Sequence, residues 1–144
     1  MILFSLMACN TEPSMKRINA LNGRIDKAEA KFKVVEKQFD ALVCDYAYVD
    51  SVLRNNNTPK NEMLLFGAYL QQFEDVRDEI VSEMDYSRSQ LKDLKDDIDN
   101  GLYDETQRTE YIDSEEKAVN VIEARIDYFS TRFKEQKEFV KTVR

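Results

Sequence analysis

Apolar residues recur at alternating spacings of three and four along most of the chain, and the longest unbroken series runs from residue 18 to residue 53. These spacings match the a and d positions of a heptad, which form one narrow stripe on an α-helix. Such a helix must bury its stripe, here called the seam, against other helices. The series comprises Ile18, Leu21, Ile25, Ala28, Phe32, Val35, Phe39, Leu42, Tyr46, Val49 and Leu53.

Two later segments repeat this pattern. In the segment between residues 63 and 98, nine of the eleven seam positions are apolar, whereas the segment between residues 112 and 143 begins less regularly and then sharpens. Each segment therefore predicts another long helix with a seam of its own. The second series is Met63, Phe66, Leu70, Phe73, Arg77, Ile80, Met84, Ser87, Leu91, Leu94 and Ile98, and the third is Ile112, Glu115, Val119, Ile122, Ile126, Phe129, Phe133, Gln136, Val140 and Val143.

Turn and capping residues separate the three segments. Ser14 precedes the first series as a helix N-cap, and residues 55–59 (Asn-Asn-Asn-Thr-Pro) end that helix and begin the next. Gly101 is the natural left-handed residue after the second helix. Asp104 and Gln107 have the spacing of a capping box at the start of the third. We therefore expect helices over residues 14–54, 59–99 and 104–143.

Helices joined by turns this short pack antiparallel to their neighbours in sequence. The predicted fold is all-α, an elongated three-helix up-down-up antiparallel bundle with coiled-coil-like packing, formed as one domain by residues 14–144. Each helix is about 60 Å long at ~1.5 Å per residue. Tight turns would place residue x of the first helix level with about residue 114 − x of the second and about residue x + 89 of the third.

Polar residues interrupt the seam at Arg77, Ser87 and Glu115. From the expected levels, Arg77 would face Glu36 and the stretch from Glu123 to Asp127. Glu115 would reach Arg88, the Ser87 hydroxyl or solvent, because a buried carboxylate without a partner is costly. These residues would form either a polar cavity or a polar layer that sets the alignment of the helices. We favour the polar layer, since polar residues in a coiled seam often specify register.

Five apolar residues outside the seam map to the end of the bundle formed by the first turn and the C-terminus. An aromatic and aliphatic cluster there is a candidate contact surface for a partner or a second copy. Alternatively, the bundle buries the positions that flank the seam, which would absorb Val52 and Phe139. The five are Tyr48, Val52, Leu64, Leu65 and Phe139.

The charge and composition of the 144-residue chain exclude several classes of function. The net charge is −7, and residues 59–100 carry eleven acidic against five basic residues, so we expect no nucleic-acid partner. The chain has no histidine, which excludes Ser/His or Cys/His catalysis and the Glu-x-x-His motif of di-iron bundles. The segment 96–107 lacks EF-hand ligands, having isoleucine and glutamine at its third and twelfth positions. We expect no catalytic residue, metal site or cofactor.

The two cysteines differ in context. Cys44 occupies the outward f position of the first helix and has no group nearby to activate its thiol. Cys9 ends an apolar run whose last four residues, Leu6-Met7-Ala8-Cys9, resemble the lipobox of bacterial lipoproteins. In that family a signal peptidase cuts before the cysteine, which then carries a diacylglycerol on its sulfur. The resemblance implies a lipidated Cys9, with residues 1–8 as the remnant of a signal peptide and residues 9–13 as a tether.

The favoured hypothesis is therefore a non-catalytic lipoprotein of the bacterial cell envelope, held to a membrane through Cys9, that acts as a helical spacer, adaptor or protein-binding module. The resemblance allows a periplasmic or an outer-membrane location, because Asn10 is not the aspartate that retains such proteins at the inner membrane of enteric bacteria. A cytoplasmic coiled-coil scaffold or assembly subunit is the alternative, and a metal-dependent helical-bundle enzyme is the third hypothesis.

Overall fold

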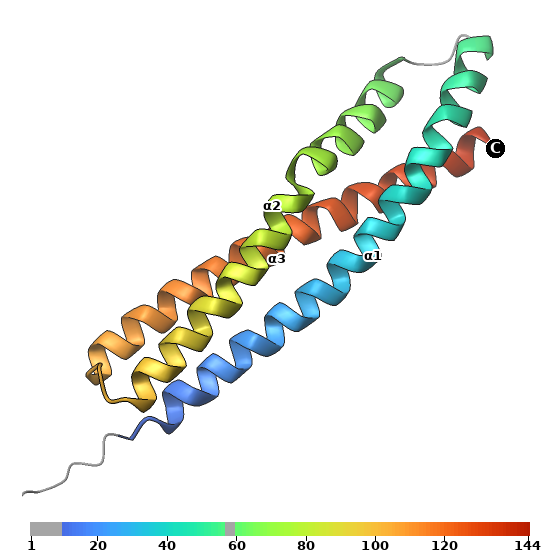
Figure 1. Cartoon of the computed structure of the whole chain (residues 1–144). Helices are drawn as coiled ribbons and strands as arrows, with labels where there is room; N and C mark the ends of the chain where they lie inside the picture. The colour runs from blue at the N-terminus through green and yellow to red at the C-terminus, as the bar shows by residue number, and fades with distance from the viewer. Residues whose placement is uncertain (1–9, 57–59) are drawn as a thin grey trace, which may run out of the picture.

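A computed structural model describes residues 10–56 and 60–144, which form three long helices (Figure 1). Helix α1 spans Glu12–Asn56, α2 spans Lys60–Asp99 and α3 spans Glu105–Val143. Helix α2 runs antiparallel to the other two, and each helix packs against both of its neighbours, most extensively α1 against α3. None of the described residues lies in a strand. The predicted all-α three-helix bundle is confirmed.

The predicted seam forms the core. Ten of the eleven residues of the first series are buried, and Tyr46, the eleventh, is half-buried against the core. All nine apolar seam residues of α2 are buried. In α3 the apolar seam residues are buried except Val143, which is half-buried against the core. The heptad pattern alone therefore identified the face that each helix buries.

Phenylalanine rings fill the middle of this core. The Phe73 ring lies 5.1 Å from those of Phe39 and Phe129, 5.3 Å from Phe133 and 5.9 Å from Phe32, measured between centroids. These rings come from all three helices. Aromatic pairs at such distances contribute about 0.5–1.5 kcal/mol each beyond the area that they bury. Phe73 is thus the residue through which the three helices share one core.

The ends of the helices follow their capping residues. After α2, Gly101 has a φ of 71°, and the Gly101 and Leu102 amides donate to the carbonyls of Ile98 and Asp97, which is a Schellman motif. At the start of α3, Asp104 and Gln107 exchange hydrogen bonds of 2.9 and 3.1 Å, so the predicted capping box is confirmed.

The predicted start of the first helix is wrong by two residues. Helix α1 begins at Glu12, whose amide donates to the side chain of Asn10 over 3.2 Å, so Ser14 is not the N-cap. Glu12 and Pro13 belong to the helix and not to a tether. At its other end α1 continues to Asn56, two residues past the predicted end. The predicted cap of α2 at residues 58–59 and the predicted signal-peptide remnant lie outside the described residues.

The levels expected between α1 and α2 are confirmed, but the level of α3 differs. Arg88 of α2 pairs with Asp26 of α1, which matches the expected relation. Between α1 and α3, however, the rings of Phe39 and Phe133 are 6.1 Å apart although they are separated by 94 residues, not 89. Helix α3 thus begins about one turn nearer the N-terminal end than predicted, because the non-helical residues 100–104 carry the chain past the end of α2 before α3 starts.

Two glycines inside helices allow a test of backbone and packing effects. A Cβ added at Gly23 of α1 would meet no atom within 4 Å, whereas at Gly67 of α2 it would lie 3.1 Å from the Tyr46 hydroxyl. Replacing an interior helical glycine by alanine removes a propensity cost of about 1 kcal/mol. We predict that Gly23→Ala raises the melting temperature by about 2–4 °C. Gly67→Ala should raise the melting temperature by less, because the added methyl group would crowd the Tyr46 hydroxyl. Thermal unfolding measured by circular dichroism checks this, and a larger gain at Gly67 would contradict it.

Candidate functional site

The structure places the three predicted polar seam residues in different environments. Ser87 is buried, with 2% of its surface exposed. Arg77 is half-buried, pairs with Glu74 of its own helix over 3.1 Å, and places its guanidinium carbon 5.9 Å from the centre of the Phe39 ring. Arg77 therefore reaches the level of α1 that the sequence predicted, but its recorded ion pair among the described residues is with Glu74 of its own helix and not with Glu36.

Glu115 has no recorded ion pair among residues 10–56 and 60–144, although it is half-buried. Burial raises the pKa of its carboxyl above the ordinary value. Of the three partners predicted for Glu115, Arg88 is wrong, since that arginine bonds to Asp26 and Glu29 of α1, at 2.8 Å each. The shifted level of α3 explains this, because Glu115 lies level with Leu21 and not with the layer of Ser87 and Arg88 that the sequence predicted. The partial exposure of Glu115 fits the solvent alternative.

Arg108 is a buried seam residue that the sequence analysis missed. Only 4% of its surface is exposed, its Nη1 donates to the Tyr103 carbonyl over 3.2 Å, and its Nε has no hydrogen-bond partner in the described structure. Tyr103 in turn donates its hydroxyl to Asp97 over 2.9 Å. Extending the heptad four residues back from Ile112 would have identified this position. Arg108 therefore anchors the α2–α3 turn rather than a ligand site.

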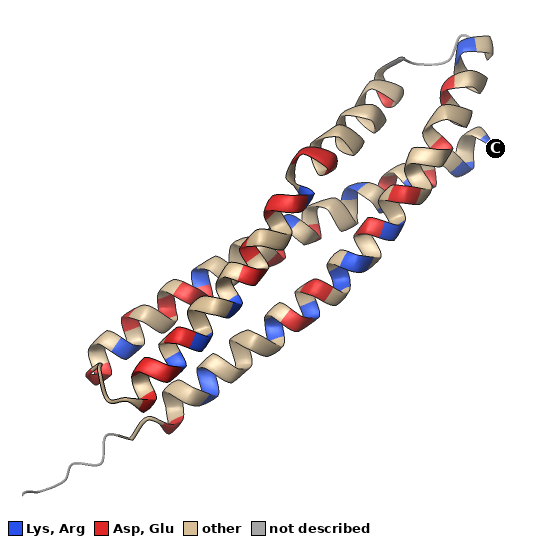
Figure 2. Ribbon diagram, viewed as in Figure 1, with Lys and Arg blue, Asp and Glu red and all other residues tan. Residues whose placement is uncertain are grey.

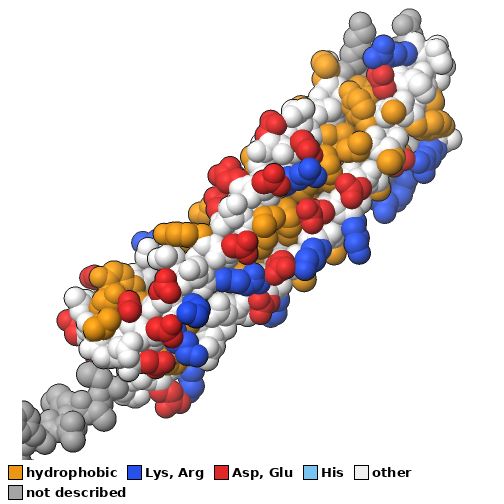
Figure 3. Space-filling model, viewed as in Figure 1, with side chains coloured by type: hydrophobic (Ala, Val, Ile, Leu, Met, Phe, Trp, Pro, Cys, Tyr) orange, Lys and Arg blue, Asp and Glu red, His pale blue; other side chains and the backbone are white. Residues whose placement is uncertain are grey.

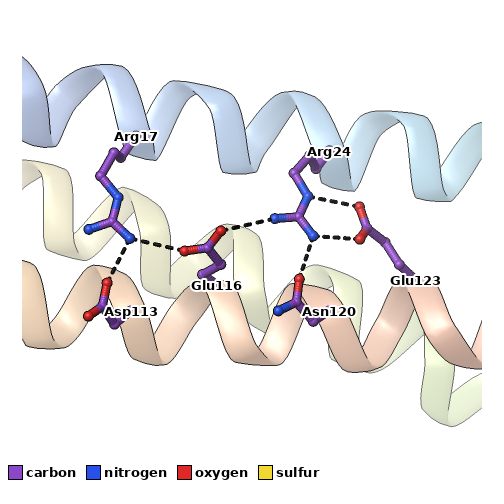
Figure 4. A network of polar contacts seen from close by, with 6 residues as sticks. All are labelled: Arg17, Arg24, Asp113, Glu116, Asn120 and Glu123. Atoms are coloured by element: carbon purple, nitrogen blue, oxygen red, sulfur yellow. Dashed lines mark hydrogen bonds and ion pairs between the residues drawn. The ribbon is translucent and has the colours of Figure 1, made fainter.

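A row of charged residues joins α1 to α3 (Figure 4). The guanidinium of Arg24 forms two bonds to Glu123, of 2.9 and 2.5 Å, and a third of 2.6 Å to Asn120. Arg17 bonds to Asp113 at 2.7 Å and to Glu116 at 3.0 Å. The hydrogen bond to Glu123 is the main cause that raises the pKa of Arg24.

The same row continues along the whole interface and changes sign. Positions 17, 24, 31, 38 and 45 of α1 are spaced by seven residues and lie at heptad position g, and the e positions of α3 that lie 99 residues later are Glu116, Glu123, Ser130, Lys137 and Arg144. Toward the N-terminal end the basic residue is on α1, as in the Arg24–Glu123 pair. Because Ser130 is uncharged, Lys31 pairs instead with Asp127, one turn earlier on α3. At the far end the order reverses, since Asp45 of α1 pairs with Arg144. We call these five levels the charge ladder.

The interface of α2 with α3 has its own polar contacts. Arg125 bonds to Glu83 at 2.7 Å and to Glu79 at 3.2 Å. Arg132 lies beside two rings, with its guanidinium carbon 5.6 Å from the centre of Tyr69 and 5.3 Å from that of Tyr128. Each pair of helices thus has arginines that cross between its two members and contribute to their alignment.

The candidate contact residues at the far end of the bundle divide into two groups. Phe139 is half-buried and packs against the core, with its ring 6.3 Å from that of Phe66. Val52 is also half-buried. Tyr48 is 47% exposed, but the Arg144 guanidinium lies over its ring. The remaining two, Leu64 and Leu65, are 70% and 52% exposed.

These two leucines belong to an uncharged outer face of α2. Residues 63–73 contain no charged side chain in a chain that is 34% charged. Their exposed members follow helical spacing, with leucines and an alanine followed by two glutamines. In Figure 3, hydrophobic side chains gather between α1 and α2 toward this same end of the molecule. We call this face the contact face: Leu64, Leu65, Ala68, Gln71 and Gln72.

Metal sites and membrane spans each have requirements that can be compared with the described residues. The described part of the chain contains no group of three or more histidine, cysteine, aspartate or glutamate side chains placed to hold a metal ion. Cys44 is exposed and free, as predicted from its heptad position, whereas Cys9 lies outside the described residues. Of the helices described, none is long and apolar enough to cross a membrane.

Comparison with protein-family models, with curated proteins and with solved structures found no match to this chain.

The charge ladder predicts a measurable stability difference. Arg24→Gln removes both bonds to Glu123 and leaves that carboxylate without its recorded cation, so we expect the melting temperature to fall by about 2–4 °C. The difference should shrink at 1 M NaCl, because salt screens partly exposed pairs. Arg54→Gln is the matched control, since the partner of Arg54 among the described residues is Asp50 of its own helix and Arg54 is highly exposed. Equal losses in the two variants, measured by thermal unfolding, would refute the role of the ladder.

The raised pKa of Glu115 predicts a pH-dependent gain in stability. Because the folded state favours the protonated carboxyl, its contribution to stability is lost as the pH rises through the raised folded-state pKa. Glu115→Gln should therefore raise the melting temperature at pH 7 by about 1–4 °C. The gain should vanish below about pH 4, where the unfolded chain is also protonated. Exposed Glu110→Gln serves as the control, and a gain that does not depend on pH would contradict the assignment.

Proposed function

We propose that this protein is a non-catalytic helical adaptor of the bacterial cell envelope, anchored through a lipid on Cys9. The observation that carries the proposal is the position of the contact face at the end of the bundle remote from the start of α1. About 35 helical residues, or roughly 50 Å at 1.5 Å per residue, separate the start of α1 from the level of Leu64 and Leu65. An anchor at the N-terminal end would hold this face well away from the membrane surface.

The form of the bundle supports a spacer rather than an enzyme. Its core is continuous from one end to the other, and the charge ladder pairs α1 with α3 toward the N-terminal end and again at Asp45 and Arg144. The hollows between α1 and α3 are small and open, with volumes of about 200 and 220 Å³, whereas small-molecule sites usually enclose about 300–1,000 Å³. A rigid rod with an exposed apolar face at one end suits the task of presenting that face to another protein.

Lipidation of Cys9 is the step that tests the anchor. The full gene, with its own upstream sequence, would be expressed in a bacterial host that lipidates exported proteins, in the presence of labelled palmitate. We expect label on the wild type and on Cys44→Ala, because Cys44 lies within α1 and outside the lipobox-like motif. We expect none on Cys9→Ala, which should also leave the membrane fraction.

The Cys44→Ala control separates lipidation from nonspecific acylation of an exposed thiol. An unlabelled wild-type protein, or label that persists in Cys9→Ala, would rule out the envelope anchor. The same outcome would favour the cytoplasmic scaffold, for which the contact face is equally suited because its geometry does not depend on a lipid.

A further inference from the structure

A groove between α1 and α3 lies at the last two levels of the charge ladder, those of Gln38 and Asp45. It has a volume of about 220 Å³, and its apolar lining comes from both helices. Leu42 and Phe133, which are core residues, contribute apolar surface, and Val34 and Ala41 are exposed at its edge. The charged lining residues are Lys37, Lys137 and Asp45, and the Asp45 carboxylate is paired with Arg144. The groove is therefore apolar in its depth, and the charges at its rim that have no ion pair within the described part of the chain are those of the two lysines.

The ladder is incomplete at this level. Gln38 occupies the g position where other levels carry a charge, and the matching e position of α3 is Lys137. The Oε1 atom of Gln38 is buried and has no hydrogen-bond partner in the described structure. Neither Lys37 nor Lys137 takes part in a salt bridge recorded among residues 10–56 and 60–144. The carboxylate that lines the groove, Asp45, is already paired with Arg144. An unsatisfied buried acceptor and two lysines without an ion pair in the described chain indicate a place where an external group docks.

The size and charge of the groove restrict what can occupy it. Its volume is below that of usual small-molecule sites and is enough for one or two aliphatic side chains. The flanking segments are basic, since residues 130–144 carry five basic and two acidic side chains. The occupant should therefore be an apolar side chain on a helix that also carries carboxylates.

The contact face of α2 has this chemistry. Leu65 is 52% exposed, and Glu62 lies three residues before it on the same side of the helix. Between residues 60 and 85 the chain carries seven acidic and two basic side chains, and acidic residues gather along α2 in Figure 2. We propose that a second copy of this chain docks its contact face into the groove, with Leu65 entering it and Glu62 facing Lys37 and Lys137. The inference rests on the proposed function in that it names the partner of the contact face.

The two surfaces lie on different sides of the bundle, so the contact is heterologous. The groove is formed by α1 and α3, whereas the contact face is on the outer side of α2. A heterologous contact that does not close into a ring continues from copy to copy. Because one leucine and a few charges bury little surface, each contact should be weak, with a dissociation constant of about 0.1–1 mM. Copies held on one surface would associate more readily, since tethering raises their effective concentration.

Sedimentation of the full chain tests this arrangement without an unidentified ligand. For the wild type we expect the average mass to rise above the chain mass of 16.9 kDa between about 10 µM and 1 mM protein, and to fall back at 1 M NaCl. Leu65→Glu removes the apolar side chain, and the double variant Lys37→Glu with Lys137→Glu reverses the rim. Each variant alone should remain at the monomer mass.

A mixture of the two variants gives the sharper result. The Leu65→Glu chain retains its groove and the double variant retains its contact face, so an equal mixture should form a one-to-one complex and nothing larger. Matched controls are Leu102→Glu and the double variant Lys95→Glu with Lys117→Glu, which make the same charge changes at exposed residues away from both surfaces. These controls should associate as the wild type does.

Three outcomes would overturn the proposal. They are a wild type that stays monomeric up to 1 mM, association that persists when the Leu65→Glu chain or the double lysine variant is measured alone, and a mixture of these two variants that does not recover the complex. These results are independent of lipidation. A chain that self-associates but carries no palmitate would contradict only the envelope anchor, whereas a labelled chain that stays monomeric would contradict only the second copy as partner.

Discussion

The alignment of α1 with α3 is the constraint on which the other features of this bundle depend. Phe39 and Phe133 meet in the core at a separation of 94 residues, and Arg24 reaches Glu123 at a separation of 99. The difference of five residues is the normal step from an a–a contact to a g–e contact between parallel helices. Core packing and charge pairing therefore specify the same register, and a slip of either helix would break both.

This register explains why the polar residues of the seam make contacts other than those predicted from the sequence. With α3 about one turn nearer the N-terminal end than predicted, Glu115 lies away from Arg88, and Arg88 pairs with α1 instead. The carboxyl of Glu115 is then left half-buried with a raised pKa. The seam has no single polar layer, and its alignment is specified mainly at its edges, by arginines that cross between helices.

The sign change of the charge ladder also divides the surface into regions with different chemistry. Basic side chains of α1 are neutralised by α3 near the N-terminal end, and the order is reversed at Asp45 and Arg144. Between these regions, at Gln38, the pairing stops and a groove opens. The contact face of α2 is also uncharged, although the rest of the surface is rich in charged residues. The proposed self-association brings the groove of one copy against the contact face of another, whereas the proposed anchor concerns only the N-terminal end.

The sequence by itself determined the number of helices, their seam residues and two of their caps. Each of these is a local or periodic property: apolar spacing identifies the buried face, Gly101 suits a left-handed turn, and Asp104 with Gln107 satisfies the first amides of α3. Only the tertiary structure decided the level of α3, the partners of Arg77, Arg88 and Glu115, and which apolar tip residues stay exposed. Those outcomes depend on how far residues 100–104 carry the chain between α2 and α3, and on which neighbouring helix each long side chain reaches. Heptad spacing carries no information on either, because it describes only which face of a single helix is buried.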